Sequence, residues 1–192
     1  MSASPLEPID PSAIAIEGAR PIPRTLHRDP RGFLVEMLRK DDRSVDGGQF
    51  AMAYTSVTVP GSFRDRDRWH VHERQTDRFI VPSGEMILAL HDARPASPTR
   101  GRLEVIRMSG APMDRPGSPE PSSLTTHLVP IPPGVLHCIG NLSDHPFVLV
   151  NFPSQLYDAT DEGRLPFADQ PIAALGGPFR WEDVPRRGSG TG

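Results

Sequence analysis

The stretch from Arg68 to Gly84 reads RWHVHERQTDRFIVPSG and contains the residues on which the fold prediction depends. His70 and His72 are two positions apart, so on a β-strand both side chains point to the same face. Asp77 follows far enough along the chain for a turn to bring its carboxylate in from the neighbouring strand. The Pro-Ser-Gly that ends the stretch predicts a hairpin turn. If the shared face lines a barrel, two imidazoles and a carboxylate enter one cavity.

A second stretch, residues 131–141, reads IPPGVLHCIGN and predicts another strand that starts after a Pro-Pro-Gly turn. His137 would lie near the mouth of this strand, and Cys138 would face the opposite side as a buried structural thiol. Three imidazoles and a carboxylate suit a divalent first-row transition metal with positions left open for substrate or water. The sequence thus predicts one such metal, of the Fe, Mn, Ni, Co or Zn type, held by His70, His72, Asp77 and His137. The alternative is a set of hydrogen-bonded histidines that line the barrel without a metal.

The rest of the chain predicts an all-β protein. Among 192 residues there are 23 Pro and 17 Gly, residues that end helices or weaken their interiors. The apolar residues form short alternating or continuous runs bounded by turn residues, which is typical of strands in a sandwich or barrel. The predicted strands are 32–39, 51–59, 67–73, 78–82, 85–91, 102–108, 124–131, 135–140 and 146–152.

Charge and cysteine content exclude several classes of protein. The formal net charge of −3 gives no basic footprint for nucleic acid, so no nucleic-acid partner is expected. One cysteine cannot form an intrachain disulfide, which fits a reducing compartment. The N-terminus lacks the pattern of a signal peptide, and no apolar run approaches the ~18–20 residues that span a membrane. We therefore expect a cytoplasmic protein without a membrane partner.

The distribution of proline and glycine predicts the domain organisation. Residues 1–24 are proline-rich and predict a loosely packed N-terminal arm, and 25–170 hold the single domain. Residues 110–123 contain four prolines, which are turn-forming residues, and therefore predict a loop. Residues 171–192 form a C-terminal extension, whose end from Arg186 onward is expected to be disordered.

The two histidine segments resemble the motifs of the cupin superfamily. The pattern His70-x-His72-(x)4-Asp77-(x)6-Gly84 resembles the first motif, with Asp where Glu is usual. The pattern from Pro132 to Asn141, with His137 inside it, resembles the second. The resemblance implies a jelly-roll cupin barrel, also called a double-stranded β-helix.

A narrower resemblance covers residues 27–170. Segments 29–36, 92–101, 133–137, 142–144 and 157–162 are similar to those of dTDP-4-dehydrorhamnose 3,5-epimerases. This family is usually dimeric and shifts protons next to a sugar 4-keto group. The resemblance implies a homodimer, His70 as catalytic base, and nucleotide contacts by Arg31 and Glu36.

Two departures from the family pattern change the expected chemistry. Counted without gaps from His137, the family's catalytic tyrosine falls on Val150, and its lysine is replaced by Asp77. We therefore predict an epimerase- or isomerase-like cupin rather than an unmodified 3,5-epimerase, with a metal that polarises the substrate carbonyl in place of the lysine.

The predicted substrate is a carbonyl-bearing sugar or related small molecule, possibly a nucleotide sugar. The candidates for moving the proton are Glu73, Tyr54 and Gln75. Arg68, in the Arg64/Arg66/Arg68 alternation, and Arg78 are further candidates for substrate binding, because arginine binds phosphate through two hydrogen bonds. A solvated strand edge is the alternative for the alternation. Two other functions stay open: an iron-dependent cupin oxygenase, and a non-catalytic sugar- or nucleotide-binding cupin.

Overall fold

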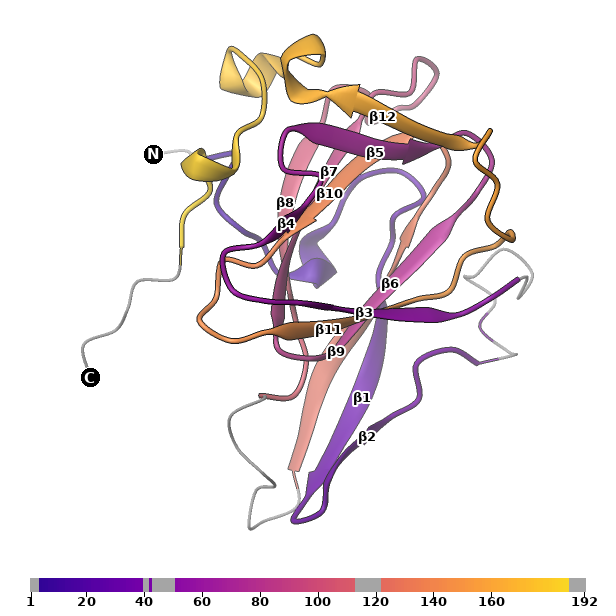
Figure 1. The fold of residues 1–192 in the computed structure, drawn as a ribbon, viewed down its shortest axis with the longest axis vertical. Coiled ribbons are helices and arrows are strands. Elements are labelled where there is room, and N and C mark those ends of the chain that lie inside the picture. Colours follow the sequence, from indigo (N-terminus) through magenta and orange to yellow (C-terminus); the bar gives the residue numbers. More distant parts are fainter. Residues whose placement is uncertain (1–3, 40–41, 43–50, 113–121, 187–192) are drawn as a thin grey trace.

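The computed structural model describes residues 4–39, 42, 51–112 and 122–186 and shows two six-stranded antiparallel sheets curled against each other (Figure 1). The first sheet has the order β2-β1-β9-β6-β11-β3, and the second has the order β12-β5-β10-β7-β8 with β4 paired to β10. This confirms the predicted all-β jelly roll. The strands are β1 (Ile22–Asp29), β2 (Gly32–Val35), β3 (Tyr54–Thr58), β4 (Phe63–Arg64), β5 (Arg68–His72), β6 (Asp77–Ser83), β7 (Glu85–Asp92), β8 (Leu103–Ser109), β9 (Ser122–Ile131), β10 (Val135–Gly140), β11 (Phe147–Asn151) and β12 (Glu162–Pro166).

Strand prediction succeeded where buried residues are apolar and failed where they are polar. The ranges 85–91, 102–108 and 135–140 agree with β7, β8 and β10 to within one residue. β1 was not among the predicted strands, because one of its two buried side chains is Arg24 rather than an apolar residue. β12 was not predicted because it is short and because two of its side chains, Glu162 and Arg164, are charged and face a cavity rather than an apolar core.

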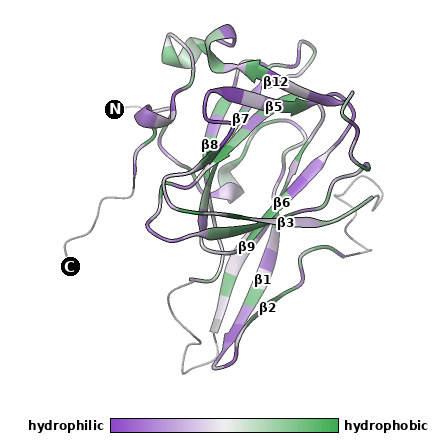
Figure 2. Ribbon diagram, in the orientation of Figure 1, coloured by the Kyte–Doolittle hydropathy of each residue, from purple (hydrophilic) through white to green (hydrophobic). Residues whose placement is uncertain are grey.

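Two apolar clusters lie on the two faces of the second sheet. The inner core fills the space between the sheets with side chains from β6 to β11, including Phe79, Leu88 and Leu149. The aromatic cluster covers the outer face and contains Trp69, Phe179 and Trp181. Figure 2 shows hydrophilic and hydrophobic residues mixed along the strands of both sheets. Successive residues of one strand therefore serve different layers.

The described part of residues 1–24 is packed against the domain, which differs from the loosely packed arm that its prolines predicted. Ile16 and Ala19 belong to the inner core and Leu6 to the aromatic cluster. The backbone N–H groups of Ala15 and Ile16 donate to the Glu104 carboxylate, so this segment has fixed hydrogen-bond partners.

The C-terminal extension also packs on the domain as far as it is described. Ile172, Phe179, Trp181 and Val184 are buried in the aromatic cluster, behind β5 and β10. Residues 187–192 of the predicted disordered end, and residues 113–121 of the predicted loop, lie outside the described residues. Within the described residues, no helix is both long and apolar enough to cross a lipid bilayer.

Asp92 organises the connection between β7 and β8. Its fully buried carboxylate accepts hydrogen bonds from Arg94 Nε and Nη2 (both 2.8 Å), Ser97 Oγ (2.5 Å) and Thr99 Oγ1 (2.6 Å). Burial alone would raise the pKa of Asp92, but these donors outweigh it and hold the pKa well below its usual range.

We expect Asp92→Asn to lower the free energy of unfolding by about 2 kcal/mol, because charge-assisted hydrogen bonds are lost from a buried site. Since the folded pKa of Asp92 is lowered, its stabilisation is present above its unfolded pKa of about 4 and is lost as the pH falls below that value. Urea unfolding between pH 3 and 7 should therefore show a difference between wild type and variant that shrinks in acid. The exposed Asp144→Asn is the matched control; equal effects of the two substitutions would contradict this role.

Candidate active site

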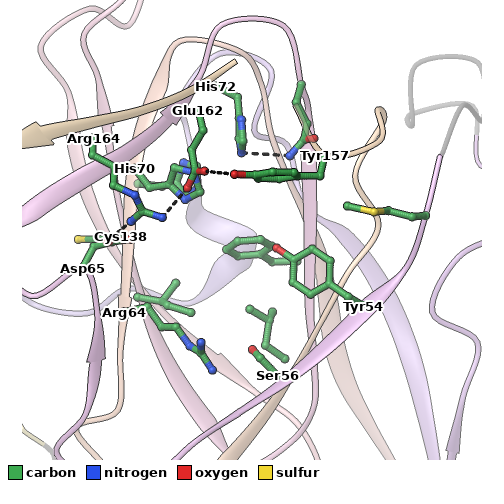
Figure 3. Close-up of a pocket in the computed structure, with 16 residues that line it drawn as sticks. Tyr54, Ser56, Arg64, Asp65, His70, His72, Cys138, Tyr157, Glu162 and Arg164 are labelled. Atoms are coloured by element: carbon green, nitrogen blue, oxygen red, sulfur yellow. Dashed lines mark hydrogen bonds and ion pairs between the residues drawn. The ribbon is translucent and has the colours of Figure 1, made fainter. Parts of the chain in front are cut away.

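A cavity of about 320 Å³ opens between the two sheets (Figure 3). One wall is formed by β5, β10 and β12, and the other by β3, β6 and β11. Apolar side chains from Phe79, Ile139 and Leu149 line part of it. The polar lining is formed by His70, His72, His137, Gln75, Tyr54, Ser56, Tyr157, Arg64, Asp65, Glu162 and Arg164.

Strand alternation brings the three predicted histidines together. On β5, Trp69 packs into the aromatic cluster while His70 and His72 turn inward. On β10, His137 turns inward, and Cys138 belongs to the aromatic cluster while also bordering the cavity. His137 pairs with His70 across the two strands. The centroid of the His70 ring lies 4.6 Å from that of His72 and 5.0 Å from that of His137.

Asp77 lies behind these histidines and is only 2% exposed. Its Oδ2 is 3.5 Å from His137 Nε2 and 3.6 Å from His72 Nε2. Its Oδ1 accepts hydrogen bonds from Gln75 Nε2 and Asn151 Nδ2, both at 2.8 Å. Burial would raise the pKa of Asp77, but His137, Asn151 and His72 together lower it to about 2. The carboxylate is therefore charged at neutral pH and shared by the imidazoles.

A second buried carboxylate contacts the other side of His72. Asp161 Oδ2 lies 3.5 Å from His72 Nδ1. The same carboxylate accepts the backbone N–H groups of Arg74 (2.9 Å) and Gln75 (3.1 Å). It thereby fixes the turn between β5 and β6.

His70 is the imidazole associated with the more open part of the cavity. Its Nε2 lies 3.4 Å from Glu162 Oε1 and makes no hydrogen bond within the described residues. Burial lowers the pKa of His70 to about 3, and the neighbouring His137 and His72 add to the effect. His70 is therefore neutral at physiological pH, the state in which a ring nitrogen can accept a proton.

Glu162 is itself held by its neighbours. It forms an ion pair with Arg164, which pairs in turn with Asp65. Its Oε2 accepts a hydrogen bond from the Tyr157 hydroxyl at 3.3 Å. Asp65 has a φ of 61°, the one positive value of a non-glycine residue in the described chain, and this sharp bend separates β4 from β5.

Tyr54 reaches the cavity from β3, in the opposite sheet from His70 (Figure 3). Its hydroxyl oxygen accepts a hydrogen bond from Asn151 Nδ2 at 2.9 Å. Burial raises the pKa of Tyr54, and the hydrogen bond from Asn151 opposes part of the rise. The phenol therefore keeps its proton at neutral pH.

Val150, the position where the family tyrosine was expected, does not face the cavity. It packs with Ile80 and Phe152 on the outer face of the first sheet, while Leu149 and Asn151 point inward. A register irregularity between Val148 and Val150 accompanies this facing. Tyr54 supplies a phenol from the adjacent strand instead.

The four residues predicted to bind a metal thus lie together. Their imidazoles, however, each lie close to a carboxylate: His72 and His137 to Asp77, and His70 to Glu162. Among the residues that the structure describes, no group of three or more His, Cys, Asp or Glu side chains has an arrangement that could hold a metal ion. Asp77 in particular has both oxygens engaged by side chains of the cluster. The described geometry fits an acid–base cluster rather than an assembled metal centre, and metal binding stays a prediction.

Several predicted site residues lie away from the cavity. Glu73 is exposed outside the cavity lining, because β5 ends at His72 and Glu73 lies in the bend that follows it. Arg31 pairs with Asp29 and has 90% of its side chain exposed, and Glu36 pairs with Arg39 at the surface.

The arginine candidates are also dispersed. Arg68 is exposed and pairs with Asp67, and Arg66 pairs with Glu182. The three arginines do not share one strand face, because Arg64 ends β4, Arg68 begins β5 and Arg66 lies between the two strands. Of the three, Arg64 lines the cavity. Arg78 is fully buried, and its Nη1 donates to the Phe152 carbonyl at 3.1 Å, which assigns it to the framework.

Sequence reasoning missed Glu162, Arg164 and Asn151 as site residues. Glu162 and Arg164 alternate with Gly163 and Leu165 along β12, so the two polar side chains share one face of the strand. This alternation could have indicated a strand that faces a cavity. Asn151 ends an apolar strand run, and a lone amide in such a position is the signal for a buried polar contact.

The chain has two clear relatives in sequence, although no family model matches it. It is 32% identical over 147 residues to the probable low-salt glycan biosynthesis epimerase Agl13 of Haloferax volcanii, covering 74% of this chain and 82% of that protein. It is 30% identical over 168 residues to the spore coat polysaccharide biosynthesis protein SpsL of Bacillus subtilis, covering 86% of this chain and 96% of that protein.

Solved structures share the fold. A dTDP sugar isomerase from Desulfovibrio desulfuricans G20 superposes with a TM-score of 0.68 at 27% identity, covering 92% of this chain and 100% of the other. A dTDP-4-dehydrorhamnose 3,5-epimerase from Elizabethkingia anophelis has a TM-score of 0.63 at 19% identity, covering 90% and 85%. Fold and sequence relatives agree, and the chain belongs to the dTDP-4-dehydrorhamnose 3,5-epimerase-like cupins.

Proposed function

We propose that this protein epimerises or isomerises a nucleotide-linked sugar by moving a proton at a carbon next to a carbonyl group. The observation that carries the proposal is the placement of His70 and Tyr54 on opposite sheets around one cavity. Inversion at a carbon requires a base on one face and an acid on the other. The comparisons support the substrate class: one relative is described as a probable low-salt glycan biosynthesis epimerase, and a structural neighbour as a dTDP sugar isomerase.

His70 is the proposed base. Its neutral Nε2 takes the proton from the carbon, and the electrons of the C–H bond form an enolate on the substrate carbonyl. Glu162, 3.4 Å from Nε2, stabilises the imidazolium that results. The guanidinium groups of Arg64 and Arg164 at the cavity supply positive charge for the enolate or for the diphosphate of the substrate.

Tyr54 is the proposed acid. It gives its hydroxyl proton to the opposite face of the same carbon, and solvent exchange then returns the proton from His70 to the phenolate. Asp77, held between His72 and His137, keeps a negative charge behind the histidines and orients them. Gln75, predicted to move the proton, instead supports Asp77 through its amide.

We expect His70→Asn to lower both solvent-deuterium exchange and epimerisation by about 10²- to 10⁴-fold, because the variant has no base to open the reaction. Tyr54→Phe should lower epimerisation by a similar factor while exchange continues, since His70 can still remove the proton and return a deuteron to the same face. The measurement is ¹H NMR in D₂O with dTDP-4-keto-6-deoxyglucose as the probe. Wild-type protein that exchanges no proton next to the ketone would overturn the proposed reaction.

Metal-dependent chemistry is the second candidate function. It is favoured by three buried imidazole nitrogens without a hydrogen-bond partner among the described residues: His70 Nε2, His72 Nδ1 and His137 Nε2. After side-chain rotation His70, His72, Asp77 and His137 would be the ligands. A divalent metal bound there would polarise a substrate oxygen.

Metal removal separates the two functions. If His70 and Tyr54 suffice, we expect protein purified without a metal-affinity step to hold well under one transition metal per chain, and EDTA treatment to leave deuterium exchange unchanged. Elemental analysis and the NMR assay measure the two quantities. One tightly bound metal per chain, with exchange lost on chelation and restored by that metal, would favour the metal-dependent function.

A further inference from the structure

Asn151 is a fully buried amide at the end of β11 whose direction is fixed by its contacts. Its Oδ1 accepts the backbone N–H of Arg78 at 2.8 Å. An amide oxygen that accepts this hydrogen bond leaves the Nδ2 group to face the other side, so the orientation of the amide follows from its partners.

The two hydrogens of Asn151 Nδ2 serve two residues of the site. One is donated to the Tyr54 hydroxyl oxygen at 2.9 Å and the other to Asp77 Oδ1 at 2.8 Å. Because Tyr54 is the acceptor, its own O–H is not used in this bond, and it has no acceptor among the described residues. The hydroxyl proton is left for a group inside the cavity.

The same amide acts on the carboxylate behind the histidines. Asn151 and Gln75 both donate to Asp77 Oδ1, which turns Oδ2 toward His72 and His137. One side chain thus contacts the proposed acid in the first sheet and the anion shared by the imidazoles.

Packing alone does not explain an asparagine at this position. The inward-facing residues before it on β11 are Phe147 and Leu149, both in the inner core. An apolar residue would continue that pattern, whereas a buried amide costs free energy unless all its groups are hydrogen-bonded. Asn151 satisfies this condition only through backbone Arg78, Tyr54 and Asp77.

We propose that Asn151 is a positioning residue that turns the Tyr54 hydroxyl proton toward the substrate and fixes Asp77 behind the histidines. The proposal rests on the proposed function of Tyr54 as the acid. It adds that the direction of proton return depends on a residue that does not touch the substrate.

The first test needs no substrate and uses Asn151→Asp, which keeps the size and the acceptor for Arg78 but removes the amide group that donates to Tyr54 and Asp77. The chain has two tyrosines, so in a Tyr157→Phe background the phenol absorbance reports Tyr54 alone. We expect Tyr54 to ionise at a higher pH in Asn151→Asp than in the parent. Asn141→Asp is the matched control, because Asn141 is also fully buried with a hydrogen-bonded amide but lies outside the cavity lining. Unchanged ionisation in Asn151→Asp would overturn the proposal.

The second test is kinetic and uses dTDP-4-keto-6-deoxyglucose in D₂O. We expect Asn151→Asp to lower epimerisation by about 10²-fold, as loss of a general acid does, while exchange stays within a few-fold of wild type. Adding Asn151→Asp to Tyr54→Phe should cause no further loss of epimerisation, since both changes remove one function. Asn141→Asp should leave the ratio of exchange to epimerisation unchanged.

Equal loss of exchange and epimerisation, or multiplying losses in the double variant, would show a structural role and overturn the proposal. Should Asn151→Asp not fold, Asn151→Ser removes the long donor without adding charge and carries the same expectations. If wild-type protein exchanges no proton of the probe, the proposed function fails, and the ionisation of Tyr54 still decides whether Asn151 positions it.

Discussion

A charged carboxylate inside a β-barrel must be surrounded by donors, and the arrangement of this cavity follows from meeting that requirement for Asp77. Removing a carboxylate from water is costly unless hydrogen bonds and opposite charges replace the solvent. Here two amides hold one oxygen and two imidazoles lie near the other. Side chains from β5, β10 and β11 therefore surround the Asp77 carboxylate on β6. His70 lies beside His72 and His137.

Much of the fold could be predicted because strand alternation is visible when one face is apolar. His70 and His72 on one strand and His137 on another were identified from spacing alone, and the structure places them in one cavity. The prediction failed for Glu73 because the strand ends at His72, which leaves Glu73 exposed in the bend that follows.

The remaining site residues could not be predicted because their roles depend on contacts distant in sequence. Glu162 meets His70 only because β12 pairs with β5, and Asn151 meets Tyr54 only because β11 pairs with β3. Counting residues along the chain also fails across an irregular strand. Val150 was the expected tyrosine position, yet its side chain packs on the outer face beside Phe152.

Tyr54 and Glu162 share one property of the sheet order: β3 and β12 are the outermost strands of their sheets, each paired along one side. His70 and His137, by contrast, belong to strands with neighbours on both sides. An outermost strand has a row of backbone groups without a strand partner, so the sheet constrains it along one side. The fold thus places the proposed base on a strand that is held along both sides, and the proposed acid and the carboxylate beside the base on strands that are held along one.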